Sequence, residues 1–193
     1  MGAVPEHEPR LQRRRRLTLA DVPLPGCPDW LGVDRALGAW GAWQRQQRSA
    51  GNPKTGLLLA DAGTVLSLTL LDAKGRFQGG QLVPGLQLQL AAMAAGTNAL
   101  QCPVFGSDPP LFPKDTGEAM LRGALQAMVG TVREAQIQSG ATLWICGGDA
   151  GALSQGLLTH DRDGVGSSAV VDEDLVLKGM VNLIETVRPN RDP

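Results

Sequence analysis

Residues 57–85 read LLLADAGTVLSLTLLDAKGRFQGGQLVPG, and this stretch decides which fold the chain can adopt. It holds three strand-like runs that are separated by short groups of residues favouring tight turns. The sequence predicts strands over residues 56–61, 64–72 and 77–82, with turns at residues 62–63 and 73–76. Strands joined by turns this short pair in opposite directions, so an antiparallel meander is expected.

Outside this meander the apolar residues mostly recur at helical spacing. Pro84 and Gly85 favour a helix start, and Asp115 with Glu118 has the spacing of a capping box. The other expected elements are a short strand within residues 16–22, helices over 34–49, 85–95 and 116–138, a strand over 143–146, a short helix, a mobile loop over 154–168, a short strand and a helix over 174–187. This order indicates a mixed α/β domain rather than a doubly wound parallel sheet.

The composition indicates one folded domain that does not act through its overall charge. The chain has 193 residues, of which 42% are hydrophobic, and this is enough to form a packed core. Its net charge is -1, so the chain as a whole offers no electrostatic attraction for nucleic acids or anionic membranes. It contains no tyrosine, which excludes a tyrosine hydroxyl from any catalytic site.

Cysteine and histidine usage indicates a reducing compartment and no zinc site. Cys27, Cys102 and Cys146 form no Cys-x-x-Cys pair, and the two histidines are far apart in the sequence. The longest apolar stretch, residues 57–71, is interrupted by Asp61 and is too short to cross a bilayer. We therefore expect a cytoplasmic protein that is not inserted in a membrane.

The first 29 residues differ from the rest because they are rich in proline and contain the run Arg13-Arg14-Arg15-Arg16. That run is either a phosphate-binding patch or, as is usual for charged termini, a solvated tail. The expected organisation is a Pro/Arg-rich segment over residues 1–29, a linking helix with a candidate site motif over 30–55, a main domain over 56–188 and a tail over 189–193.

Asp61-Ala62-Gly63-Thr64 lies at the tip of the first predicted hairpin. A carboxylate in such a turn can hold a cation, and a glycine there permits a positive φ. Successive backbone N–H groups, together with the Thr64 hydroxyl, can then bind phosphate oxygens. The alternative is that the motif only forms a hairpin turn.

Two further motifs lie at the starts of predicted helices. Gly147-Gly148-Asp149 follows a buried strand, where glycines would let a base or ribose approach the backbone, although it can also be a turn capped by Asp149. Gly32-Val33-Asp34-Arg35 places a carboxylate and a guanidinium side by side near the positive end of a helix dipole. Arg35 could bind a ligand carboxylate, or Asp34 could be only the helix N-cap and Arg35 a surface residue.

Taken together in chain order, these motifs resemble those of the type III pantothenate kinases. The series is Gly32-Val33-Asp34-Arg35, Asp61-Ala62-Gly63-Thr64, Gly79-Gly80-x-x-x-Pro84-Gly85, Asp115-Thr116 and Gly147-Gly148-Asp149. The resemblance covers residues 31–184 and implies a ribonuclease-H-like domain of the acetate kinase, sugar kinase, Hsc70 and actin superfamily. It also implies ATP-dependent phosphorylation of pantothenate to 4'-phosphopantothenate, the first step of coenzyme A biosynthesis.

The resemblance implies a role for each matching residue. Asp34 matches the general base, which accepts the proton of the pantothenate hydroxyl. The implied pantothenate contacts are Gly32, Val33, Asp34, Arg35 and Thr116, the ATP contacts are Gly63, Thr64, Gly147 and Gly148, and the ligand of a monovalent cation is Asp61. The implied cofactors are K⁺ or NH₄⁺, together with Mg²⁺ bound to ATP, and the implied assembly is a homodimer.

Two features depart from the family pattern. The family's opening turn, Asp-x-Gly-Asn-Thr, holds the ATP phosphates, and no such turn precedes Gly32. The tyrosine that usually stands shortly before the Gly-x-Asp-Arg motif is replaced by Pro25 and Gly26. We therefore expect the first domain to be largely missing and the 193 residues alone to have little or no kinase activity. The alternatives are a non-catalytic regulatory protein of the transcriptional accessory type and a nucleic-acid-binding protein that uses its arginine run.

The predicted helix over residues 116–138 is the expected dimer interface. Its apolar stripe is broader than one sheet face covers, and Gly123, Ala127 and Gly130 leave room for a second helix. A two-fold axis there would bring Thr116 close to residues 32–35 of the partner subunit. The alternative is that the whole stripe is buried within one subunit.

Overall fold

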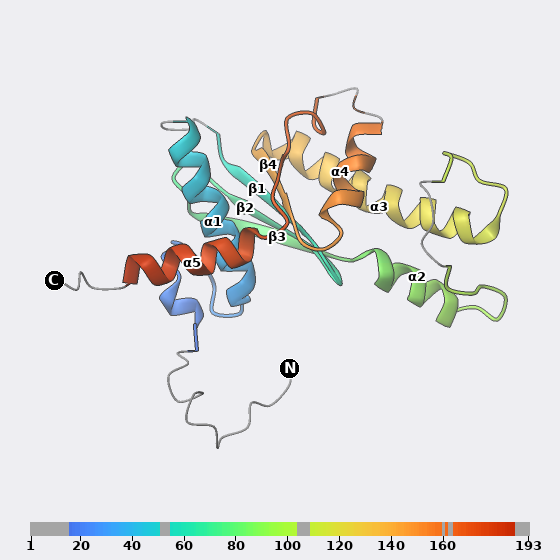
Figure 1. Ribbon diagram of the computed structural model, residues 1–193, viewed down its shortest axis with the longest axis horizontal. Coiled ribbons are helices and arrows are strands. Elements are labelled where there is room, and N and C mark those ends of the chain that lie inside the picture. The colour runs from blue at the N-terminus through green and yellow to red at the C-terminus, as the bar shows by residue number, and fades with distance from the viewer. Residues whose placement is uncertain (1–15, 51–54, 104–108, 160, 162–163, 188–193) are drawn as a thin grey trace, which may run out of the picture.

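The computed structural model describes residues 16–50, 55–103, 109–159, 161 and 164–187. Within them one five-stranded sheet has helices on both faces (Figure 1). The strands are β1 (Leu57–Ala62), β2 (Val65–Leu71), β3 (Phe77–Pro84), β4 (Thr142–Cys146) and β5 (Val170–Val171). The helices are η1 (Leu19–Asp21), α1 (Val33–Ala50), α2 (Leu86–Ala95), α3 (Thr116–Ser139), α4 (Ala150–Thr159) and α5 (Leu175–Val187).

The sheet has the strand order β3-β2-β1-β4-β5. β1, β2 and β3 pair antiparallel, which confirms the predicted meander, whereas β4 pairs parallel to β1 on its other side and β5 pairs parallel to β4. The carboxyl ends of β1 and β4 therefore lie at the same edge of the sheet, and Asp61 is the register partner of Cys146 there.

A hydrophobic core lies between the sheet and its helices on each face. One core joins α1 and α5 with the segment that precedes α1, and it includes Leu37, Leu59 and Trp144. The other joins the opposite face of β1, β2 and β4 with α2, α3 and α4, and it includes Leu66, Met128 and Ile145. Among the described helices, none is both long enough and apolar enough to cross a membrane.

The predicted order of helices and strands is confirmed from α1 to α5. The predicted short strand within residues 16–22 is wrong, because η1 lies there instead. The Asp21 carboxylate accepts hydrogen bonds from the backbone N–H and the hydroxyl of Thr18, at 2.9 and 2.8 Å. Such local side-chain bonds compete with strand pairing and favour a turn. The first three residues of the arginine run, and the predicted tail, lie outside the described residues.

The predicted mobile loop over residues 154–168 is also wrong in its first part, which belongs to α4. Leu153 and Leu157 are fully buried, so the apolar face of a helix overrides the polar and glycine-rich composition. Gly156 lets α4 approach α3 closely, since a Cβ there would lie 2.7 Å from Val129. After α4, the Asp161 carboxylate accepts hydrogen bonds from the backbone N–H groups of Gly166 and of the residue that follows it.

Candidate active site at the carboxyl end of the central strand

The tip of the β1–β2 hairpin is held against the start of α2. The backbone N–H of Gly85 donates to the carbonyl of Thr64 at 3.0 Å. A Cβ on Gly85 would overlap the carbonyl of Gly63, so only glycine allows this approach. The motif that includes Thr64 and the motif that ends at Gly85 are therefore in direct contact. The exposed Thr64 side chain lies at the surface of the tip.

The strand-to-helix turn after β4 contacts the same tip from the other side. The backbone N–H of Asp149 donates to the carbonyl of Ala62 at 2.8 Å. Gly147 has a φ of +93°, and a Cβ there would lie 2.6 Å from Oδ1 of Asp61. Gly63 does not have the positive φ that the sequence suggested; that conformation occurs at Gly147 instead. Three of the predicted motifs thus meet at one edge of the sheet.

Asp61 is a partly buried carboxylate between two strands. Burial raises its pKa above the ordinary aspartate value, and the like charge of Asp34 raises it further. A hydrogen bond from the Cys146 thiol and the positive charge of Arg35 act in the opposite direction without reversing the shift. Burial also raises the pKa of Cys146, so this thiol stays protonated and can donate to the carboxylate. The ionised form of Asp61 is therefore disfavoured even with a thiol donor and a guanidinium nearby.

Asp61→Asn is expected to raise the melting temperature near pH 7. Because its native pKa is raised, the folded state binds the Asp61 proton more tightly than the unfolded state does, so stability falls as pH rises above about 3.9. The amide carries no such cost, and the gain should therefore disappear as pH falls below about 3.9. Thermal melts at several pH values check this, with exposed Asp29→Asn as the control. A lower melting temperature at neutral pH would contradict the prediction.

The motif around Asp34 forms the start of α1. The helix begins at Val33, and the backbone N–H of Ala36 donates to the carbonyl of Gly32, so Asp34 lies in the first turn rather than at the N-cap. Oδ1 of Asp34 accepts a hydrogen bond from the backbone N–H of Arg35 at 2.9 Å. A Cβ on Gly32 would lie 2.5 Å from that oxygen, so glycine makes room for the carboxylate. The Asp34 carboxylate is otherwise exposed.

Arg35 is not a free surface residue. Its Nη2 donates to the carbonyl of Leu68 at 3.0 Å and to the hydroxyl of Thr69 at 3.2 Å, both on β2. Burial lowers the pKa of Arg35, and the charges of Asp34 and Asp61 oppose that shift. The two carboxylates and the guanidinium are therefore close enough to interact. The motif around Asp34 and Arg35 thus lies near the motif that begins at Asp61.

Thr116 does not join this group within the chain. It is the first residue of α3, and the Asp115 carboxylate accepts from the backbone N–H of Glu118 at 3.0 Å, which confirms the predicted N-cap. The yellow-green start of α3 lies beside α2, on the far side of the molecule from α1 and α5 (Figure 1). Any shared site between Thr116 and Asp34 therefore requires a second chain.

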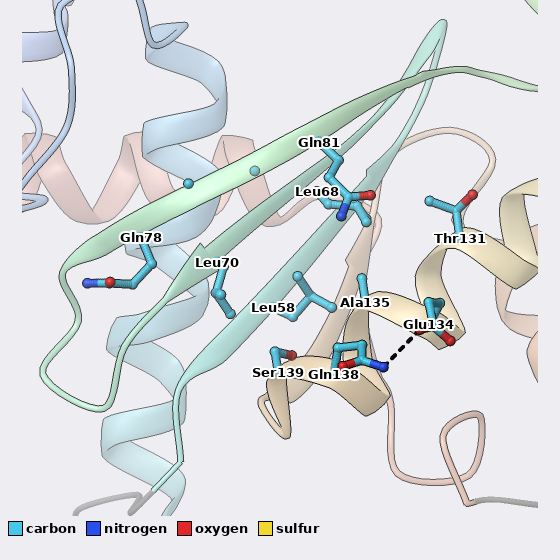
Figure 2. A pocket seen from close by; sticks show the side chains of 12 residues that line it. Leu58, Leu68, Leu70, Gln78, Gln81, Thr131, Glu134, Ala135, Gln138 and Ser139 are labelled. Carbon is cyan, nitrogen blue, oxygen red and sulfur yellow. Dashed lines mark hydrogen bonds between the residues drawn. The ribbon is translucent and has the colours of Figure 1, made fainter.

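A groove lies between the sheet and α3. It encloses about 560 Å³ between the sheet and the C-terminal half of α3, and Figure 2 shows leucines on its floor and polar side chains of α3 along one side. Its lining includes Leu58, Leu68, Gly79 and Gln138, but none of the charged motif residues. Gly79 and Gly80 of the motif that ends at Gly85 line the groove, but the charged residues of the candidate site do not.

Sequence reasoning missed two residues of the site, Thr69 and Cys146. Each is at most 1% exposed and bonds a charged motif residue, Thr69 to Arg35 on α1 and Cys146 to Asp61 on the neighbouring strand. The first contact depends on how α1 packs on the sheet and the second on the strand register, although a threonine inside a run of leucines is a polar signal worth attention.

Comparison with known proteins places these motifs in a family. The family described as type III pantothenate kinase matches residues 24–138. A curated relative from Rhodopirellula baltica, described as a type III pantothenate kinase, is 36% identical over 182 residues, covering 89% of this chain and 62% of its own length. For one from Synechococcus elongatus the identity is 35%, with 69% and 49% covered, and for one from Synechococcus sp. strain JA-3-3Ab it is 34%, with 92% and 71% covered.

The chain spans 62% and 49% of the first two relatives, so it matches about half to two thirds of their length. A crystal structure from Campylobacter jejuni, described as belonging to the Baf family of transcriptional activators, superposes with a TM-score of 0.61. That likeness covers 86% of this chain and 70% of the other at 18% identity, and it supports the fold alone.

Proposed function

Because the chain belongs to the type III pantothenate kinase family, we propose that the protein transfers the γ-phosphoryl group of ATP to the hydroxyl of pantothenate. The product would be 4'-phosphopantothenate, in the first step of coenzyme A synthesis in the cytoplasm. The observation that carries this proposal is that Asp34 and Arg35 interact electrostatically with Asp61, beside the hairpin tip where the other motifs meet. The mixed α/β sheet has the actin-like fold of this family.

Asp34 is the proposed general base. Its exposed carboxylate lies in the first turn of α1, where the backbone of Arg35 orients one oxygen. Phosphoryl transfer depends mostly on positioning and charge stabilisation, so the main requirement on the base is that it is oriented toward the hydroxyl. The pantothenate site would also include Gly32, Val33 and the guanidinium of Arg35.

The ATP phosphates are proposed to bind at the hairpin tip. The Thr64 hydroxyl and the backbones of Gly63, Gly147 and Gly148 lie around that tip, and Gly148 has no neighbour within 4 Å of its Cβ position. Mg²⁺ would arrive with ATP and neutralise phosphate charge. The chain's own contribution is to orient the phosphates with backbone N–H groups.

The single carboxylate of Asp61 fits a monovalent cation better than a divalent one. Among the described residues, no three His, Cys, Asp or Glu side chains gather where they could hold a metal ion. Burial and the charge of Asp34 both disfavour the ionised form of Asp61, and a bound K⁺ or NH₄⁺ would offset both effects. We therefore assign the proposed monovalent cation to Asp61.

A homodimer would complete the pantothenate site. Thr116 lies far from Asp34 within one chain, so its proposed contact with pantothenate requires the threonine of a second copy. The apolar stripe of α3 gives no support for this, because its members are buried within the chain against the sheet, α2 and α4. The support is the row Gly123, Ala127 and Gly130, which is exposed and, at both glycines, open.

The proposed activity is tested by coupled ADP release from the natural gene product that contains this chain. Release should require both ATP and pantothenate, and K⁺ or NH₄⁺ should accelerate it relative to Na⁺. Phosphopantothenate should form in equal amount, as measured by mass spectrometry. Binding of pantothenate without ADP release would contradict the proposal and favour a non-catalytic protein with the kinase fold.

A further inference from the structure

Arg35 connects the start of α1 to the middle of β2. Its Nη2 donates to the carbonyl of Leu68 and to the hydroxyl of Thr69, at 3.0 and 3.2 Å. Thr69 is a polar residue in a central strand, only 1% exposed, and this bond from Arg35 satisfies its hydroxyl. Two acceptors on one nitrogen hold the guanidinium in a defined place.

Gly80 provides the space for this arrangement. It is the register partner of Thr69 on β3, so the two residues share a face of the sheet. A Cβ on Gly80 would lie 2.6 Å from Nη2 of Arg35 and would also overlap the carbonyl of Leu68. The guanidinium therefore occupies a position that any side chain at residue 80 would obstruct.

One part of the guanidinium remains without a partner. Nε of Arg35 is buried and has no hydrogen-bond partner among the described residues. Buried donors without acceptors are rare and costly, so this one leaves the guanidinium with unused hydrogen-bonding capacity. An arginine donates along two edges in a rigid plane, so fixing Nη2 also fixes the direction of Nε.

We propose that Thr69 is a positioning residue, which holds Nη2 of Arg35 so that the rest of the guanidinium faces the carboxylate of the substrate. The proposal rests on the proposed function, because that function supplies a substrate with a carboxylate. Thr69 itself does not touch the substrate. It acts by keeping Arg35 from turning toward solvent, and its hydroxyl, rather than its size, carries the effect.

Thr69→Val tests this, because valine has the same shape but no hydroxyl. Affinities are measured by calorimetry for pantothenate and for its neutral analogue, in which a primary alcohol replaces the carboxylate. The affinity for pantothenate should fall roughly tenfold, as expected for a lost hydrogen bond to a charged group. The affinity for the neutral analogue and the KM for ATP should stay unchanged. Arg35→Lys should reduce the preference for pantothenate over the analogue at least as much.

Thr142→Val is the matched control. Thr142 also lies in a strand, and its hydroxyl bonds that of Thr55 at 3.0 Å at the opposite end of β1 from Asp61. This variant should bind both ligands as the unmodified protein does. If Thr69→Val binds pantothenate normally, or loses affinity equally for both ligands, the positioning role is wrong.

A ligand-free measurement separates this proposal from the proposed function. The Arg35 side chain is followed by ¹⁵N NMR and assigned by its absence in Arg35→Lys. Slow rotation of the guanidinium should be seen in the unmodified protein and lost in Thr69→Val, but kept in Thr142→Val. Unchanged rotation in Thr69→Val would overturn the positioning role even if pantothenate does not bind. Normal positioning without any pantothenate binding would instead overturn the proposed function.

Discussion

Asp34→Asn is expected to lower kcat for phosphoryl transfer by roughly 10²–10⁴, the range typical of a lost general base. The amide cannot accept the proton of the pantothenate hydroxyl, but its oxygen can still accept the hydrogen bond from the backbone of Arg35. The start of α1 should therefore be unchanged, and so should ATP binding, because the proposed phosphate contacts lie at the hairpin tip. Steady-state kinetics and ATP binding by calorimetry measure the two effects.

Asp29→Asn is the control for this variant, because Asp29 is an exposed carboxylate in the segment just before α1. It should leave kcat unchanged. Near-normal turnover of Asp34→Asn would show that the Asp34 carboxylate acts only at the start of α1. Loss of ATP binding together with turnover would instead indicate that the whole site depends on its charge.

The second large effect is expected from Ala127→Arg, which should raise the dissociation constant of the proposed dimer at least 100-fold. Ala127 is exposed on α3, and Gly123 and Gly130 on the same row have open space at their Cβ positions. An arginine there would not disturb the chain's own core, but it would place an unpaired charge in the interface, at a cost of about 3–5 kcal/mol. Light scattering with gel filtration should show a monomer.

Kinase activity should fall together with dimerisation, because the monomer would lack Thr116 of the partner subunit. Gln155→Arg on the exposed face of α4 adds the same charge elsewhere and should leave the dimer intact. Circular dichroism should show the same folded spectrum for both variants, although Ala127→Arg should melt at a lower temperature because it has lost the stabilisation that the dimer supplies. The dimer proposal fails if the unmodified protein elutes at the mass of a single chain at micromolar concentration.

The sequence predicted local structure well, because that information lies in neighbouring residues. The meander follows from Gly63 and from the turn around Gly75, and the start of α3 follows from Asp115. The composition of residues 154–159 suggested a loop, and it was overridden by Leu153 and Leu157, which pack beneath α3. Burial against a distant helix is not visible in local composition.

The motifs of the candidate site could be selected from the sequence, but the contacts between them could not. Asp34, Asp61 and Gly147 were selected from their neighbours in the sequence. The proximity of Asp61 to Gly147 depends on the parallel pairing of β1 with β4, and that of Asp34 depends on the packing of α1 against β1 and β2. The contact of Arg35 with Thr69 joins residues 34 positions apart. The apolar stripe of α3 appeared too broad for one sheet face because the sequence does not show that α2 and α4 also cover it.

The contacts at the hairpin tip also restrict how the chain can change in length. The carbonyls of Ala62 and Thr64 each accept one backbone hydrogen bond, from Asp149 and Gly85, and these bonds join three turns that are distant in sequence. An inserted or deleted residue in any one of the turns would break its bond and move its glycine out of register with the other two. The three turns should therefore tolerate neither insertions nor deletions singly, and a transplanted site would have to carry all three together.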